Sequence, residues 1–407
     1  MNSSDRPTRR TPYNHDPTVG WFELFYDLII VAATLELGVQ LAKHPTWRMA
    51  GWIALCFTLL FGVWVLTTLH SNFRSHPTST TYPIIVIQMM GILIACLAAN
   101  RHGGIDDWHG LVAVAVVFST VSALYAVGNH ILEDVERRSR RILERSFGLA
   151  AIICLVGALL PKNIEKRYAP LCLLLAIAIV AISSLGPYVG DRVKRHVINE
   201  AHLSERMGQL ILILLGESFL KVVLSIGRGG GRPDYLLLTC TFIIVFSLWA
   251  LYFEPTIAGI VPNTISRMRI WLIAHIGIGA SALGLAVGLS EITILDQDVA
   301  ITKVATLLIA FPLMFMLFCL AITEMATPSP VRATPYVRLG TSSAVLIVAG
   351  ISLYTPFDGP TLFLVLVTLV VVCGIVTDRI LIKKMDVSPI TRGELFDAWT
   401  DPSKGSL

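Results

Sequence analysis

The chain places carboxylates inside segments that are otherwise apolar enough to lie in a membrane. The stretch WFELFYDLIIVAATLEL, residues 21–37, carries Glu23, Asp27 and Glu36. A carboxylate at the centre of a spanning helix costs about 2.5 to 3.5 kcal/mol on insertion scales. Three of them in one segment therefore need a reason, and membrane-embedded acids are typical of proton relays and solute pathways.

Two acids, Glu36 and Glu217, lie deeper than the others. At the rise of a helical residue, Glu36 lies about 20 Å beyond Glu23, and Glu217 about 18 Å beyond Glu205. A carboxylate at that depth does not reach water cheaply, and it suits taking up and releasing a proton. We therefore expect both to carry proton coupling and to flank a shared polar cavity, with Lys221 forming an i,i+4 ion pair with Glu217. The alternative is a buried structural pair.

Other charged and titratable residues gather where several of these helices meet one membrane surface. Glu23 and Asp27 lie one turn apart on the first helix, on one face. The further residues expected in this layer are His70, Arg74, His202, Glu205, Arg206 and Glu254. Arginine–carboxylate pairs there either lock the helices together or serve a site with a histidine switch, and both interpretations stay open.

The composition indicates a polytopic membrane protein. Of 407 residues, 54% are hydrophobic and 15% charged, and the mean hydropathy is +0.70. Windows of about 20 apolar residues recur, each long enough to cross a bilayer core of about 30 Å. The sequence thus predicts an all-α transmembrane bundle of about twelve spans, near 21–42, 47–70, 82–100, 109–129, 146–161, 168–187, 206–227, 234–253, 269–290, 302–323, 337–354 and 360–380. The fifth span is the weakest because Pro161 and Lys162 end it early, so ten or eleven spans also fit.

The positive charges predict the orientation. With the N-terminus in the cytoplasm, the tails and the loops on that side hold 22 of the 32 Lys and Arg residues, the opposite loops hold nine, and Lys221 lies inside a span. That bias is the positive-inside signal. Both termini and the loops 133–145 and 191–205 are therefore expected in the cytoplasm.

Short matches suggest that six helices are repeated once. FGVWVL at 61–66 resembles FSLWAL at 246–251, and GILIACLAA from Gly91 resembles GIGASALGL from Gly277 at almost the same offset. An even-numbered repeat keeps both halves in the same orientation, so the axis relating them runs along the membrane normal. The domains predicted from this pattern are a polar leader at 1–20, a first half at 21–190, a cytoplasmic linker at 191–205, a second half at 206–380 and a cytoplasmic tail at 381–407.

Several classes of function find no support in the sequence. The basic residues lie in short loops, so nucleic acid is a poor partner. No GxGxxG, GxxxxGK[ST] or HExxH motif is present, and the cysteines lack ligand spacing, so we expect no cofactor and no metal. LGESF resembles a nucleophile elbow only faintly, so Ser218 is not expected to be a nucleophile.

A family resemblance extends over most of the chain. FELFYDLIIVAATLELG resembles the opening signature of the bacterial low temperature requirement A (LtrA) family, HLSERMGQLILILLGES resembles its second signature, and WALYFEP and AHIGIGASALGLAVGLSE resemble later segments. The resemblance implies a polytopic protein of the bacterial inner membrane and assigns no reaction or solute. Its motif positions here are Glu23, Asp27, His202, Glu205, Arg206, Gly216, Glu217 and Ser218.

This sequence also departs from the family pattern. LHSNFRSHP lacks the expected acid near the end of the second span, and YFEPTIAG replaces an ending rich in Asp. Lys221 stands where apolar residues are usual. These changes put in doubt whether the chain handles the same substrate as other members.

Three functions remain open. The leading hypothesis is a secondary transporter for a small solute or ion, with proton coupling through Glu36 and Glu217. The second is a membrane enzyme that acts on a lipid-soluble isoprenoid or lipid substrate at the cytoplasmic face. Its acid and base groups would be Glu23, Asp27, His70, Glu205 and Glu254, and its pocket would be lined by Trp21, Phe22, Phe25, Tyr26 and Trp64. The third is a sensor or assembly factor without turnover. Membrane lipid is the one partner expected in each case, and the sequence fixes neither the substrate nor the oligomeric state.

Overall fold

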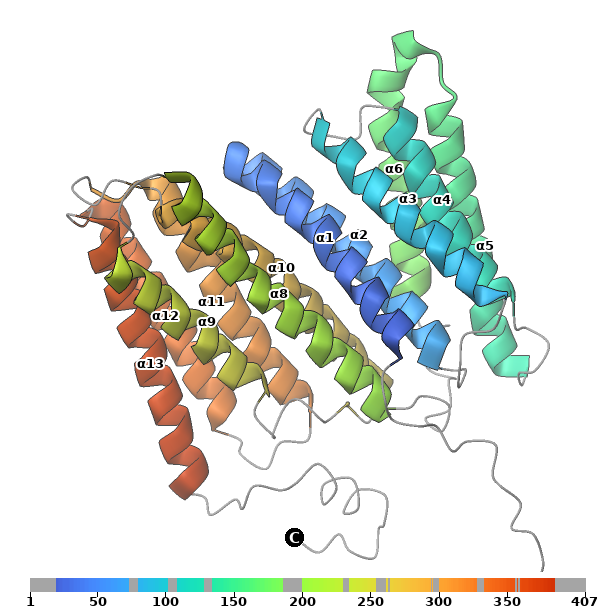
Figure 1. The fold of residues 1–407 in the computed structure, drawn as a ribbon. Coiled ribbons are helices and arrows are strands. Elements are labelled where there is room, and N and C mark those ends of the chain that lie inside the picture. The colour runs from blue at the N-terminus through green and yellow to red at the C-terminus, as the bar shows by residue number, and fades with distance from the viewer. Residues whose placement is uncertain are drawn as a thin grey trace, which may run out of the picture.

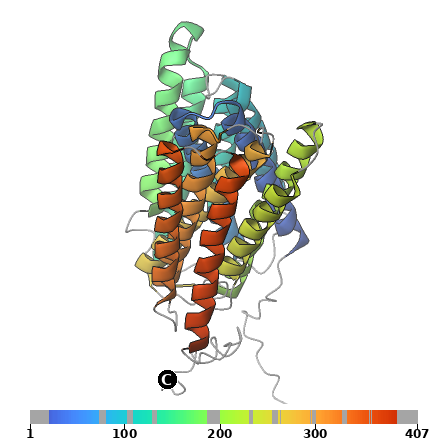
Figure 2. The same ribbon diagram turned by 90° about the vertical axis from the view of Figure 1, so that its left-hand side faces the viewer.

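The computed structural model describes residues 20–72, 80–101, 108–127, 134–185, 200–229, 234–253, 261–262, 264–293, 295, 300–327, 333–355, 357 and 359–384. Every regular element within those ranges is an α-helix. The helices run alongside one another in a single bundle, as the two views of Figure 1 and Figure 2 show. The all-α prediction is thus confirmed for the described chain.

The helix bounds follow the predicted spans closely, except that the fifth helix begins well before its predicted span at 146–161. The helices are α1 (Trp21–Lys43), α2 (Trp47–Asn72), α3 (Thr81–Arg101), α4 (Trp108–Ala126), α5 (Asp134–Ala158), α6 (Lys162–Leu185), α8 (Glu200–Gly229), α9 (Tyr235–Phe253), α10 (Ile265–Ile292), α11 (Lys303–Ala326), α12 (Thr334–Tyr354) and α13 (Pro360–Lys384). Among the described residues, all of these except α5 and α6 are both long and apolar enough to cross a membrane. In α6 the apolar part is shorter, Tyr168–Ser184.

Two of the predicted loops are partly helical. Helix α5 begins at Asp134, so the stretch predicted as the loop 133–145 forms its first turns. Helix α8 begins at Glu200, before the predicted end of the 191–205 linker. Arg and Glu are good helix formers, so a helix continues past its apolar part although a hydropathy window ends there.

Aromatic residues mark many helix ends. Side chains that the bundle leaves exposed near an end include Trp21, Trp47, Tyr82, Trp108, Tyr235, Tyr336 and Tyr354. Trp and Tyr are enriched at membrane–water interfaces, where one part of the ring system is apolar and another can hydrogen-bond. The pattern agrees with helices that end at the two surfaces of a bilayer.

The helices pack in two sets along the chain. In the first set, α1 contacts α2 and α3, and α3 to α6 each pack on the next helix. In the second set, α8 contacts α9 and α10, and α10 to α13 each pack on the next helix. The sets meet where α1 and α2 contact α8 and α10. Figure 1 shows α1 and α2 between the other helices of the first set and α8 to α13.

Helix α10 is the most enclosed of the candidate spans, and glycines allow its close packing. A Cβ added at Gly279 would lie 2.6 Å from the Phe57 ring of α2, and one at Gly288 would lie 2.3 Å from the Leu308 carbonyl oxygen of α11. Pro312 cannot donate to that carbonyl, because proline has no N–H. Glycine is therefore needed at position 288, where α10 packs directly against the exposed Leu308 carbonyl of α11.

Candidate functional site

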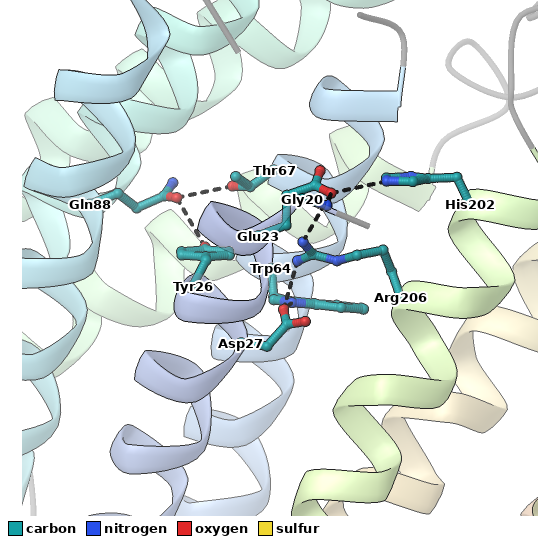
Figure 3. Close-up of polar contacts among 9 residues, drawn as sticks. All are labelled: Gly20, Glu23, Tyr26, Asp27, Trp64, Thr67, Gln88, His202 and Arg206. Carbon is teal, nitrogen blue, oxygen red and sulfur yellow. Dashed lines mark hydrogen bonds and ion pairs between the residues drawn. The ribbon is translucent and has the colours of Figure 1, made fainter. Parts of the chain in front are cut away.

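Helices α1, α2 and α8 meet in a cluster of charged side chains near the first turns of α1 and α8. This Arg206 cluster consists of Glu23, Asp27, Trp64, His202 and Arg206 (Figure 3). The sequence predicts four of its five members in one layer, and the structure brings those four into direct contact. The fifth member, Trp64, was expected only as an apolar lining residue of the enzyme hypothesis, and the structure gives it a hydrogen bond to Asp27 instead.

Arg206 occupies the centre of the cluster. Its Nη2 lies 2.6 Å from Asp27 Oδ1, and its Nη1 lies 3.6 Å from Glu23 Oε2. The same Glu23 oxygen lies 3.0 Å from His202 Nε2. Arg206 is 1% exposed, so the ion pairs replace its contact with water. The guanidinium thus bridges two carboxylates of α1 from α8.

Trp64 of α2 also contacts the Asp27 carboxylate. The indole N–H donates to Asp27 Oδ1 over 2.6 Å, and the Arg206 guanidinium carbon lies 5.7 Å from the centre of the indole ring. Asp27 Oδ2 is buried and has no hydrogen-bond partner within the described chain. The carboxylate therefore joins three helices through one oxygen atom.

Helical spacing explains why these side chains can meet. Glu23 and Asp27 are four residues apart on α1, and His202 and Arg206 are four apart on α8, so each pair lies on one helix face. The backbone N–H of Gly20 also donates to Glu23 Oε2 over 3.2 Å. A carboxylate in the first turn of a helix interacts favourably with the unpaired N–H groups there.

A polar network continues from this cluster into the first set of helices. Tyr26 of α1 and Thr67 of α2 both donate to Gln88 Oε1 of α3, over 2.9 and 3.0 Å. Gln88 is fully buried, and its Nε2 has no partner within the described residues. Figure 3 shows this network beside the Arg206 cluster. The sequence analysis did not identify Gln88, because a single amide in an apolar helix gives little signal.

A second charged site lies deeper, where α8 faces α1. Lys221 Nζ lies 3.1 Å from Glu217 Oε1, which confirms the predicted i,i+4 pair. The Thr34 hydroxyl of α1 lies 2.8 Å from the Val31 carbonyl oxygen and 3.3 Å from Glu217 Oε2, so its single proton is shared between these two acceptors. Hence a residue of α1 does approach Glu217, but it is Thr34 and not Glu36.

Gly38 makes room for the lysine of this pair. A Cβ added at Gly38 would lie 2.1 Å from Lys221 Nζ and 3.0 Å from Leu283 Cδ1 of α10. The ammonium group therefore lies directly against the α1 backbone, beside apolar side chains of α10. The Glu217–Lys221 pair is enclosed by three helices, two of which belong to the second set.

Glu36 lies on another side of α1. It is two residues after Thr34, which is about 200° around the helix axis. It is half-buried and near enough to Cys96 of α3 to interact electrostatically. Within the described residues, no hydrogen bond or ion pair joins Glu36 to Glu217. The structure thus gives no contact that supports the expectation that Glu36 and Glu217 flank one cavity.

The remaining predicted residues are spread more widely. The His70 ring is buried, 5.7 Å from the ring of Tyr125 on α4. Glu205 is half-buried on α8, Ser218 is fully buried, and Glu254 lies outside the described residues. Of the aromatics expected to line one pocket, Trp21 and Phe25 are exposed, whereas Tyr26 and Trp64 are buried. Trp21 and Phe25 therefore lie on a different face of α1 from the buried Tyr26.

A third buried charged group lies among α11, α12 and α13, and the sequence analysis missed it. Arg338 lies 3.2 Å from Glu324 and 3.5 Å from Asp378, and Thr334 also donates to Glu324. All three charged residues fall near predicted span ends, where ions usually reach water and give no signal of burial.

These sites differ in what they can do chemically. In the Arg206 cluster both carboxylates already pair with the arginine, which favours holding helices together over acid or base catalysis. The Glu217–Lys221 pair holds a single acid and a single base away from the surface layer. The described residues contain no group of three or more His, Cys, Asp or Glu side chains placed to hold a metal ion. All seven cysteines are free thiols.

Comparison with known proteins gives one family match. A family model described as "Bacterial low temperature requirement A protein (LtrA)" matches residues 18–376. No curated protein matches the chain. The matched range runs from just before α1 almost to the end of α13, so it includes the Arg206 cluster and the Glu217–Lys221 pair.

Proposed function

The chain belongs to the LtrA family of bacterial membrane proteins, and on that premise we propose that it is a proton-coupled secondary transporter for a small solute or ion. The observation that carries the proposal is the Glu217–Lys221 ion pair at the contact between α8 and α1. Ionisable groups inside membrane helices are costly, and those that persist commonly belong to ion or substrate pathways.

The position of the pair between the two helix sets supports transport. Thr34 belongs to the first set and Glu217 to the second, so a change at Glu217 acts on the contact between the sets. Transporters commonly alternate access by rocking one bundle of helices against another around a central site. Protonation of Glu217 weakens its pairing with Lys221 and thereby couples a proton to that movement.

The Arg206 cluster supplies the contact that such a movement would break. It ties the beginnings of α1 and α8 through Glu23, Asp27 and Arg206. With the predicted orientation, the protein lies in the inner membrane of a bacterial cell with both termini in the cytoplasm, and this end of the bundle faces the cytoplasm. We propose that the cluster closes the pathway on that side.

The proposal includes a repeat of six helices. The order in which α3 to α6 pack is the same as the order for α10 to α13, and α1 contacts α3 as α8 contacts α10. Helices α2 and α9 differ: α2 packs on α4 and on the second set, whereas α9 packs on α13. A repeat in which only α2 and its counterpart α9 have different neighbours explains both the shared packing order and this difference.

Proton flux into proteoliposomes tests the proposal. Purified protein is reconstituted with a pH-sensitive dye inside, and succinate, inorganic phosphate, glutamate, choline or potassium is added outside under a pH gradient. At least one solute is expected to drive proton movement. Glu217→Gln should lower that flux by about tenfold or more, because the proton site is removed. Glu36→Gln, in the second proposed proton site, is expected to lower it as well.

The matched control is Glu144→Gln, a half-buried acid of α5 away from both sites. It should leave the flux unchanged. Full flux in both Glu217→Gln and Glu36→Gln would overturn the proton-coupling role. Turnover of isoprenoid or lipid extracts by the detergent-solubilised protein, without proton flux in proteoliposomes, would favour the enzyme hypothesis instead.

A further inference from the structure

We propose that Lys221 binds a small anion, with a carboxylate as the leading chemical class, when Glu217 takes up a proton. This inference rests on the proposed transport function and names the class of its substrate. It starts from Lys221, which the structure places against the α1 backbone at Gly38.

The surroundings of Lys221 leave its charge with one partner. Its ammonium group lies 3.1 Å from Glu217 Oε1, against the Gly38 backbone and the apolar Leu283 and Val287. An ammonium group has three N–H donors. In the described chain Nζ makes no hydrogen bond of good geometry beyond that ion-pair contact. Lys221 therefore has donors to spare for a ligand.

Lys221 is the more accessible member of the pair. The Lys221 side chain is 11% exposed and that of Glu217 only 1%. Lys221 is also nearer to the end of α8 at Gly229 than Glu217 is, away from the Arg206 cluster. An anion that enters from that end meets the ammonium first.

Charge balance then links the anion to a proton. When a proton binds a Glu217 oxygen, the ion pair breaks and Lys221 is left as an unpaired, largely enclosed cation beside apolar side chains, which is unfavourable. An anion restores the pair by accepting N–H bonds from Nζ, while the proton stays on Glu217. One proton and one monoanion together add no net charge to the site.

A carboxylate fits this exchange because it has the same chemistry as the group it replaces. Ser218 lies about one turn before Lys221 on α8 and is a candidate for a further donor, because its hydroxyl is buried and has no hydrogen-bond partner among the described residues. Thr34, whose hydroxyl lies 3.3 Å from Glu217 Oε2, is also within the site. Charge and hydroxyl donors together favour an oxygen anion over a cation or a neutral solute.

Thermal unfolding of the full-length protein in detergent tests the anion site. Sodium acetate is compared with sodium gluconate at equal sodium concentration. Gluconate is a bulkier carboxylate and controls for size, whereas the Lys221→Met change controls for binding of acetate elsewhere and for general salt effects. Glu217→Gln should unfold at a lower temperature than wild type in gluconate, and acetate should raise that temperature by several degrees through binding. The double variant Glu217→Gln with Lys221→Met should unfold at a higher temperature than Glu217→Gln in gluconate and should not respond to acetate.

A proton measurement on the wild-type protein keeps the test independent of how well the variants fold. Acetate added to weakly buffered protein, from a stock at matched pH, should cause proton uptake, whereas Lys221→Met should show none. No uptake by wild type, or an equal response of wild type and Lys221→Met, would overturn the anion site. If acetate behaves as expected but no solute drives flux in proteoliposomes, the transport proposal fails alone. If flux depends on Glu217 but Lys221→Met retains it in full, the anion inference fails alone.

Discussion

At the scale of single residues, the site depends on side chains that each serve more than one partner. Arg206 pairs with two carboxylates through two different nitrogens and covers the Trp64 ring. A planar fork of donors can do this, whereas a single ammonium group cannot. The identity of the residue matters here as much as its charge.

Arg206→Lys should therefore destabilise the protein although the charge is retained. We expect a loss smaller than the about 3 to 5 kcal/mol typical of removing one partner of a buried pair, and a loss in that range for Arg206→Met. Thermal unfolding in detergent measures both. Arg138→Lys, at an exposed arginine of α5, is the matched control and should leave the unfolding temperature unchanged. Equal unfolding temperatures for Arg206→Lys and wild type would contradict the bridging role.

Gly38 should be intolerant of the smallest side chain. In Gly38→Ala the new methyl group would lie 2.1 Å from Lys221 Nζ, so the lysine must move away from its place beside Glu217. Because Nζ is the end of a flexible side chain, the stability loss should be at the lower end of the about 1 to 3 kcal/mol range for overpacking, whereas proton flux should fall because the ion pair is displaced. Gly62→Ala on α2 meets nothing within 4 Å and serves as the control. If the two alanine variants unfold and transport alike, the proposed contact between Gly38 and Lys221 is wrong.

At the scale of elements, close helix approach depends on paired features of two helices. Pro312 leaves the Leu308 carbonyl of α11 without its helical donor, and Gly288 of α10 lies against that carbonyl. Gly284 lies against the Pro312 ring in the same way. The glycine-rich segment of α10 is thus explained by packing.

Gly288→Ala should separate α10 from α11. Its Cβ would lie 2.3 Å from a backbone oxygen, which cannot rotate away as a side chain can. We expect a loss at the upper end of the about 1 to 3 kcal/mol range for overpacking. Gly350→Ala on α12, with nothing within 4 Å, should unfold like wild type in the same thermal assay. An unchanged unfolding temperature for Gly288→Ala would rule out this close approach.

At the scale of the whole molecule, the Arg206 cluster and the charged group around Arg338 lie at the same end of the bundle. The Arg206 cluster joins the beginnings of α1 and α8. The group around Arg338 joins the beginning of α12 to the ends of α11 and α13. Figure 1 shows the beginnings of α1 and α8 at the same end as the last turn of α13. The predicted orientation places this end in the cytoplasm, next to the basic residues.

Cysteine labelling in intact cells tests that orientation. Arg138→Cys, exposed on α5, should react with a membrane-impermeant maleimide only after permeabilisation. His44→Cys, exposed between α1 and α2, should react without it. Ser139 is a poor reporter because it is only 5% exposed. The parent chain, with its own seven cysteines, gives the background. Labelling of Arg138→Cys without permeabilisation would show that the predicted orientation is wrong.

The sequence by itself determined the fold class, the membrane setting and most helix positions. Apolar length and the position of charges depend only on local composition, so hydropathy located the spans and spacing predicted the Glu217–Lys221 pair. It also placed Glu23, Asp27, His202 and Arg206 in one layer, because helix direction and depth follow from counting residues.

Only the tertiary structure decided which groups in a layer touch. Trp64 and Gln88 came to the site through the packing of α2 and α3, which leaves no periodic signal in an all-apolar helix. Glu36 and Thr34 lie at similar depth, yet the rotation of α1 about its axis brings Thr34 to Glu217. That rotation, like the place of Arg338 between Glu324 and Asp378, is set by contacts between helices distant in the sequence, and those contacts follow from side-chain shapes that composition and depth do not specify.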